Sequence, residues 1–155
     1  MTEYFEIHER DSAARLGELR LDDPVTTPAL IDEVRDDAGS RWTPGETEVE
    51  GDDSTLTILP HRAFPGGTPE EVEEAFAVEY PDVDFPSAAV VSPDTAENHG
   101  TDAYVLSNAQ ELAGHARALV DAIVETRAAI PADTALYLPG VATPGNVAIL
   151  AYAGV

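Results

Sequence analysis

Apolar and polar side chains alternate in two short runs near the start of the chain, residues 4–8 and 16–21, with a polar segment between them. This alternation is typical of two antiparallel strands joined by a turn, because successive side chains of a strand point to opposite faces. A third apolar run, 25–31, contains Pro28, and a proline belongs at a sheet edge or a strand start because it has no N–H to donate. The pattern predicts a hairpin with a third strand at its edge.

The middle of the chain changes from this pattern to a different one. Residues 32–53 are rich in Asp, Glu and Gly, with Trp42 as the only large apolar residue in the middle, and they predict a surface loop with one strand across 47–49. Residues 88–91 are apolar throughout, as expected of a strand that is buried on both faces. Together with this run, apolar segments predict further strands at 55–60, 103–106 and 135–138.

Helix signals separate these later strands. Thr68, Pro69 and Glu71 form a capping box with proline at the first helical position, which predicts a helix to about Tyr80. The same reasoning predicts three more helices: a short one over 92–97, a long one from Asn108 to Pro131 with apolar positions at steps of three and four, and a last one that begins at Thr143 and is closed by Gly154.

Alternating strands and helices favour an α/β fold with a parallel sheet and right-handed crossovers, either doubly wound or a (β/α)₈ barrel. A complete barrel needs about 250 residues, so four strand and helix units supply about half of one. The chain stops at Val155, just after a helix cap, where another strand would be expected. We therefore expect the amino-terminal piece of a longer protein, with a β-rich segment over 1–53 and an α/β portion over 54–155.

In parallel sheets, ligands bind at the loops that follow the carboxyl ends of the strands. His61 and Arg62 follow the first of these strands and could bind an anion or exchange a proton near neutral pH, although a solvated loop is the interpretation we favour. Asn108 suits a helix cap better than a catalytic role. Gly140 and Thr143 lie in a restricted turn that could receive a phosphate or a carboxylate, or could simply connect a strand to a helix. These five residues are weak candidates for substrate binding, and no catalytic residue is assigned.

The charged residues are strongly unbalanced: the chain has thirty acidic residues, no lysine and eight arginines, for a net charge of −22. This composition is typical of proteins from a salt-saturated cytoplasm, where screening lets a dense carboxylate surface stay hydrated without strong repulsion. Hydrophobic residues make up 43% of the chain, which argues against disorder. So negative a surface also argues against broad, nonspecific binding to nucleic acid.

Several classes of protein and site are excluded or disfavoured. Without cysteine there are no disulfides and no thiolate metal sites, and no histidine pair has helical metal-ligand spacing, so we expect neither a metal nor a cofactor in this chain. The amino terminus is acidic and lacks the features of a signal peptide, and no apolar stretch is long enough to span a membrane. We expect a soluble, cytoplasmic protein.

Three segments resemble a family of archaeal tRNA-modifying enzymes. Residues 5–31, especially 14–19 (Ala-Arg-Leu-Gly-Glu-Leu) followed by Thr-Pro-Ala at 27–29, resemble the amino-terminal hairpin and first strand of archaeal tRNA-guanine transglycosylases. Residues 136–144 (Leu-Tyr-Leu-Pro-Gly-Val-Ala-Thr-Pro), continuing through 150–155, are similar to the paralogous archaeosine synthases. With residues 100–107, these segments occur in matching order along the whole chain.

The resemblance implies a transferase built on a barrel that acts in the synthesis of archaeosine from a deazaguanine base in tRNA. The catalytic Asp-Ser-Gly-Gly-Phe-Gln type of motif of the transglycosylases is not in this sequence. This absence favours the synthase branch, in which free lysine is the donor, over base exchange by a transglycosylase. The family implies tRNA as a partner of the full-length protein, and we expect this stretch alone to be inactive. A noncatalytic interaction domain and a homo-oligomer remain alternatives.

Overall fold

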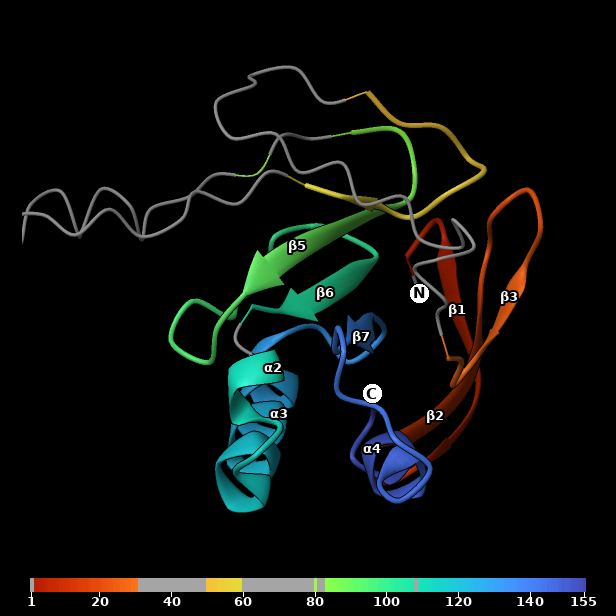
Figure 1. Ribbon diagram of the computed structural model, residues 1–155. Helices are drawn as coiled ribbons and strands as arrows, with labels where there is room; N and C mark the ends of the chain where they lie inside the picture. Colours follow the sequence, from red (N-terminus) through yellow and green to blue (C-terminus); the bar gives the residue numbers. More distant parts are fainter. Residues whose placement is uncertain (1, 31–49, 60–79, 81–82, 108) are drawn as a thin grey trace, which may run out of the picture.

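The computed structural model of the chain describes residues 2–30, 50–59, 80, 83–107 and 109–155 (Figure 1). Several predictions lie outside these residues, namely the strand at 47–49, the helix that begins at Thr68, and the candidate residues His61, Arg62 and Asn108. The described residues form an antiparallel sheet, a parallel sheet and helices.

The antiparallel sheet contains β1 (Phe5–Asp11), β2 (Ala14–Leu19) and β3 (Val25–Thr27), in that order. A tight turn joins β1 to β2, and Ser12 adopts a left-handed backbone conformation in it (φ 55°). Pro28 follows β3 directly, in agreement with its inability to donate a backbone hydrogen bond. The predicted hairpin and the predicted edge strand are confirmed.

The parallel sheet contains β4 (Thr57–Ile58), β5 (Ser87–Val91), β6 (Ala103–Leu106) and β7 (Ala135–Tyr137). All neighbouring strands run parallel, and their order in the sheet is their order along the chain. The four predicted strands are present, although β4 is much shorter than the predicted 55–60. The predicted α/β class, an antiparallel hairpin followed by parallel strands with helices, is confirmed.

Three helices lie in the described part of the chain: α2 (Ala109–Leu112), α3 (Ala116–Ala129) and α4 (Val147–Tyr152). The prediction of one long helix over 108–131 is wrong, because a turn at Gly114 separates α2 from α3. The His115 N–H closes this turn by donating to the Leu112 carbonyl (2.8 Å). Glycine inside a helix costs about 1 kcal/mol relative to alanine, so Gly114 is a favourable place for the break.

Residues 92–97 form a turn, and the short helix predicted there is wrong. The backbone N–H of Ser92 donates to Thr95 Oγ1 (2.8 Å), and the N–H of Thr95 donates to the Ser92 carbonyl (3.1 Å). A hydroxyl side chain that bonds nearby backbone groups in this way offers an alternative to helical hydrogen bonding. The same residues that suggested a helix cap therefore close a turn.

The carboxyl end of α4 is closed by Gly154, as predicted. Gly154 has a left-handed φ of 90°, and its N–H donates to the Ala151 carbonyl while the Val155 N–H donates to the Leu150 carbonyl. This is the pair of bonds that defines a Schellman motif. A Cβ at position 154 would lie 2.5 Å from the Ala13 carbonyl oxygen, so the motif also lets α4 approach the β1–β2 turn.

The parallel sheet is covered on both faces. One face packs against α3 through a core cluster that includes Ala89, Tyr104 and Ile123. The opposite face packs against the antiparallel sheet through a second cluster that includes Phe5 and Ala103. Figure 1 shows α2 and α3 to one side of β5 and β6, and β1 to β3 to the other. Burial on both faces explains why residues 88–91 of β5 are all apolar.

Candidate functional site

Two of the five predicted binding residues, Gly140 and Thr143, lie among the described residues, in the loop between β7 and α4. Gly140 has a left-handed φ of 66°. A Cβ at this position would lie only 2.5 Å from Nε2 of Gln110, an exposed residue of α2. The structure therefore brings the loop after β7 into contact with the helix that follows β6, at the carboxyl edge of the sheet where ligands bind in this class of fold.

Replacing Gly140 by alanine is expected to destabilise the chain by about 1–2 kcal/mol, because alanine is strained at positive φ and its Cβ displaces Gln110. Gly145 in the same loop gives a matched control, since a Cβ there would meet nothing closer than Thr143 Oγ1 at 3.8 Å. Urea unfolding of both variants in molar KCl measures the difference. Equal stabilities of the Gly140→Ala and Gly145→Ala variants would contradict this view of the loop.

Thr143 lies in a turn before α4, because α4 begins at Val147 and not at Thr143 as predicted. The Thr143 N–H donates to Asn146 Oδ1 (2.7 Å), and the Asn146 side-chain amide donates to the Val141 carbonyl (3.0 Å). The backbone donor that the sequence suggested for a phosphate is therefore already engaged. A role of Thr143 in binding substrate stays a prediction that rests on its exposed hydroxyl.

Gln110 is a candidate that the sequence alone did not suggest. Its amide carries both a donor and acceptors, it is exposed, and it lies against Gly140 at the carboxyl edge of the sheet. Thirty residues separate Gln110 from Gly140 along the chain, so no local pattern could have paired them. The only signal in the sequence was its position just after the predicted end of a parallel strand.

A cavity of about 520 Å³ extends from Gly140 along β7 towards the carboxyl end of α4. Its lining is mostly apolar and comes from both sheets and from α4, including Leu19, Leu56, Tyr137 and Leu150. Among the described residues that line it, Arg15 is the only one with a charged side chain. Because none of the described lining residues is Asp, Glu or His, this part of the cavity suits an apolar group or a polypeptide segment better than acid–base chemistry.

His99 has a structural position in the loop between β5 and β6. Its side chain is 10% exposed, and its ring lies edge-on to the Tyr80 ring with centroids 4.9 Å apart. The backbone N–H of His99 donates to the Tyr104 hydroxyl (2.9 Å), and the Tyr80 hydroxyl donates to the Val90 carbonyl (2.5 Å). These bonds hold the loop between β5 and β6 against the core.

Burial raises the pKa of the Tyr80 hydroxyl from 10.0 to about 12. Between these two values the unfolded chain releases the proton while the folded chain retains it, so stability is lost as pH rises from about 10 to about 12. We expect a shallower decline in a Tyr80→Phe variant, measured by urea unfolding across this range. An identical decline in both proteins would contradict the prediction.

Some kinds of site are not found within the described ranges. There, no group of three His, Asp or Glu side chains is placed to hold a metal ion. No helix in the same part of the chain is long and apolar enough to cross a membrane. What the described residues offer at the carboxyl edge is a set of polar groups beside an apolar cavity.

Two curated proteins match the chain over its whole length. Archaeosine synthase from Haloferax volcanii is 61% identical over 155 residues, which are 26% of that protein. Archaeosine synthase subunit alpha from Methanosarcina acetivorans is 34% identical over 180 aligned positions, which are 29% of that protein. No family model matches the chain, and no solved structure matches it. The chain thus spans about a quarter of the length of these relatives, and its resemblance to archaeosine synthases is confirmed from end to end.

Proposed function

We propose that this chain is part of an archaeosine synthase and serves the modification of a deazaguanine base in archaeal tRNA. The observation that carries the proposal is the 61% identity with the Haloferax volcanii archaeosine synthase along all 155 residues. The Methanosarcina acetivorans protein, which is named archaeosine synthase subunit alpha, supports the proposal with 34% identity.

In this proposal, free lysine is the donor that modifies the base already inserted in tRNA. The described residues hold no cluster of acidic, basic or nucleophilic groups in the cavity beside β7. We therefore place the residues that perform the reaction in the remaining three quarters of the relatives' length, and we expect this chain alone to be inactive. Gly140, Thr143 and Gln110 would then border the substrate rather than react with it.

The role of the chain would be to supply the first strands of a (β/α)₈ barrel. Four parallel strands that neighbour one another in chain order are the arrangement that such a barrel requires. The antiparallel sheet would cover one face of these strands, as it does here through Phe5 and Leu19. A soluble enzyme that meets tRNA in the cytoplasm is consistent with this role.

The proposal is tested with the complete parent protein in about 2 M KCl, so that the carboxylate surface is screened. The substrates are isotopically labelled lysine and tRNA that carries the deazaguanine base. We expect label to enter the tRNA and mass spectrometry to locate it on that base. In a parallel assay that supplies labelled free base, exchange of the base in place of lysine transfer would favour a transglycosylase instead, and the absence of both reactions would contradict the proposal.

A noncatalytic interaction domain is the alternative from another class, and the feature that could support it is the outer edge of β7, beyond which the described part of the chain places no strand. Size-exclusion chromatography in molar salt separates the two readings. A monomer that binds no other subunit argues against an interaction domain, whereas a stable homo-oligomer or hetero-oligomer without lysine transfer would favour it.

A further inference from the structure

Two arginines lie directly opposite each other in the antiparallel sheet. Arg10 of β1 and Arg15 of β2 are cross-strand partners next to the turn. Like charges in this position are destabilising. The chain has thirty carboxylates for eight arginines, so an opposite charge would be the common neighbour, and the pairing of two cations calls for a physical explanation.

Neither of these guanidinium groups is neutralised by a carboxylate among the described residues. Arg10 Nε donates to the Ser12 carbonyl (3.0 Å), and Arg15 Nη1 donates to the Ala13 carbonyl (2.6 Å). The carboxylate next to Arg10 along the chain, Asp11, accepts a hydrogen bond from Ser12 Oγ (3.4 Å) instead. Both arginines are held in place by turn carbonyls, and no described carboxylate forms an ion pair with either of them.

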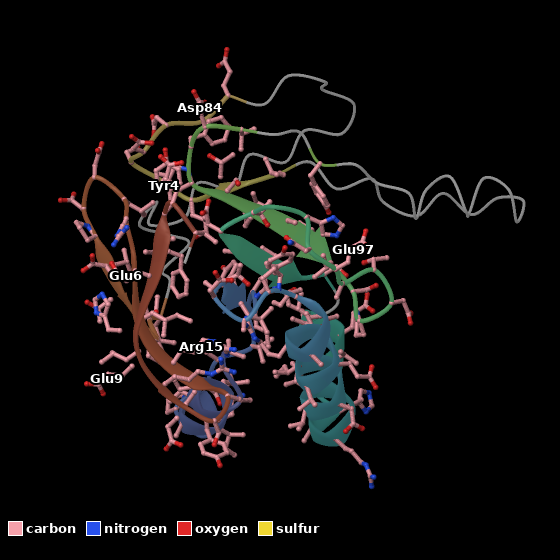
Figure 2. All side chains as sticks on the ribbon, turned by 180° about the vertical axis from the view of Figure 1, so that it is seen from behind. Tyr4, Glu6, Glu9, Arg15, Asp84 and Glu97 are labelled. Carbon is pink, nitrogen blue, oxygen red and sulfur yellow. The ribbon has the colours of Figure 1, made fainter. Side chains whose placement is uncertain are left out.

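A third arginine reaches the same region from α3. Arg127 donates to the carbonyls of Thr134 (3.1 Å) and Pro131 (3.3 Å), while Arg15 Nε donates to the Ala132 carbonyl (3.1 Å) in the same loop. The Nε of Arg127 is buried and has no hydrogen-bond partner. Figure 2 shows Arg15 between the hairpin and α4.

The electrostatic surroundings show that the three charges act on one another. Burial, and then the nearby charges of Arg15 and Arg10, lower the pKa of Arg127 from 12.5 to about 10. Burial and Arg10 likewise lower the pKa of Arg15. The ion pairs among the described residues involve other cations, at Arg20, His99 and Arg117. Three of the eight arginines therefore form a local positive patch on a strongly negative chain.

We propose that Arg10, Arg15 and Arg127 form an anion site that takes a phosphate group. Guanidinium groups recognise phosphate through paired N–H donors, and Arg10 and Arg15 each retain N–H groups that no described residue accepts. A phosphate would neutralise the cross-strand pair and offset its repulsion. The site lies at the loop that precedes β7, and Arg15 also lines the cavity that extends from Gly140.

The phosphate has two possible sources, the phosphodiester backbone of RNA or free phosphate. The RNA source rests on the proposed function, whereas the free-phosphate source does not. If RNA supplies the phosphate, the positive patch attracts it locally, whereas the overall net charge of −22 repels a nucleic acid.

The test compares Arg10→Gln with Arg117→Gln. Both variants lose one exposed arginine, but the Arg117 side chain is 96% exposed and pairs, among the described residues, with Asp121 on α3. Inorganic phosphate is titrated into each protein at a fixed salt concentration while the arginine side-chain N–H signals are followed by NMR. Fluorescently labelled tRNA is titrated in parallel at several salt concentrations, and thermal unfolding confirms that each variant is folded.

We expect Arg10→Gln to weaken phosphate binding by about tenfold and Arg117→Gln to leave it unchanged. If RNA is the source, Arg10→Gln also weakens tRNA binding. The slope of the logarithm of the binding constant against the logarithm of the salt concentration then becomes shallower by about one, because one phosphate contact is lost. Loss of phosphate binding alone identifies free phosphate as the ligand and leaves the archaeosine proposal untouched. Equal binding of both ligands by both variants would contradict the proposed site. The arginines would then only stabilise the β1–β2 turn and the loop before β7 through their hydrogen bonds to backbone carbonyls.

Discussion

Replacing Ile123 by alanine is expected to lower the free energy of unfolding by about 3–4 kcal/mol. The Ile123 side chain is 0% exposed and lies on α3 within the core cluster that joins this helix to the parallel sheet. Truncation removes apolar surface from a close-packed interior and leaves a cavity that the rigid strands β5 and β6 cannot collapse to fill.

The adjacent residue provides the control. Val124 is 56% exposed, so Val124→Ala should change stability by less than about 0.5 kcal/mol. Urea unfolding of both variants in molar KCl measures the two values. A loss of similar size for Ile123→Ala and Val124→Ala would mean that α3 does not pack on the sheet as described.

Replacing Asp102 by alanine is expected to cost about 3 kcal/mol, because the carboxylate connects the two sheets. Asp102 is 7% exposed and accepts hydrogen bonds from the backbone N–H groups of Tyr4 (3.3 Å) and Ser87 (3.1 Å). Figure 2 places Tyr4 beside Asp84, whose carbonyl accepts the Tyr4 hydroxyl bond (2.8 Å). Without Asp102, two N–H groups lose their acceptor and the start of β1 loses its link to the parallel sheet.

Asp94→Ala is the matched variant, since Asp94 is exposed and its removal changes the net charge by the same amount. Amide hydrogen exchange gives a readout that is specific to the link. In Asp102→Ala, the Tyr4 and Ser87 amides should exchange faster than in wild type, whereas Asp94→Ala should leave them protected. Unchanged protection of both amides in Asp102→Ala would contradict this role.

The strands could be predicted because their signals are local. Period-two alternation fixed the hairpin, and the wholly apolar run at 88–91 identified β5 as buried on both faces. The break between α2 and α3 was missed because the apolar positions continue through it. The signal that indicated a break was Gly114, a glycine inside the predicted helix. The turn at Ser92 was missed because the hydroxyl groups that cap helices also close turns.

The candidate sites depend on contacts that a local pattern does not contain. Gly140 could be recognised as a turn residue, but its contact with Gln110 joins two different strand and helix units. The pairing of Arg10 with Arg15 depends on the register of the hairpin, which a shift of one residue would abolish. The approach of Arg127 to this pair also requires α3 and the loop before β7 to be in place.

The nucleosides of tRNA from a strain that lacks the parent gene test the central claim most directly. We expect mass spectrometry to find archaeosine absent and the unmodified deazaguanine base in its place, and reintroduction of the intact gene to restore archaeosine. Archaeosine at its normal level in the strain without the gene would contradict the proposed function.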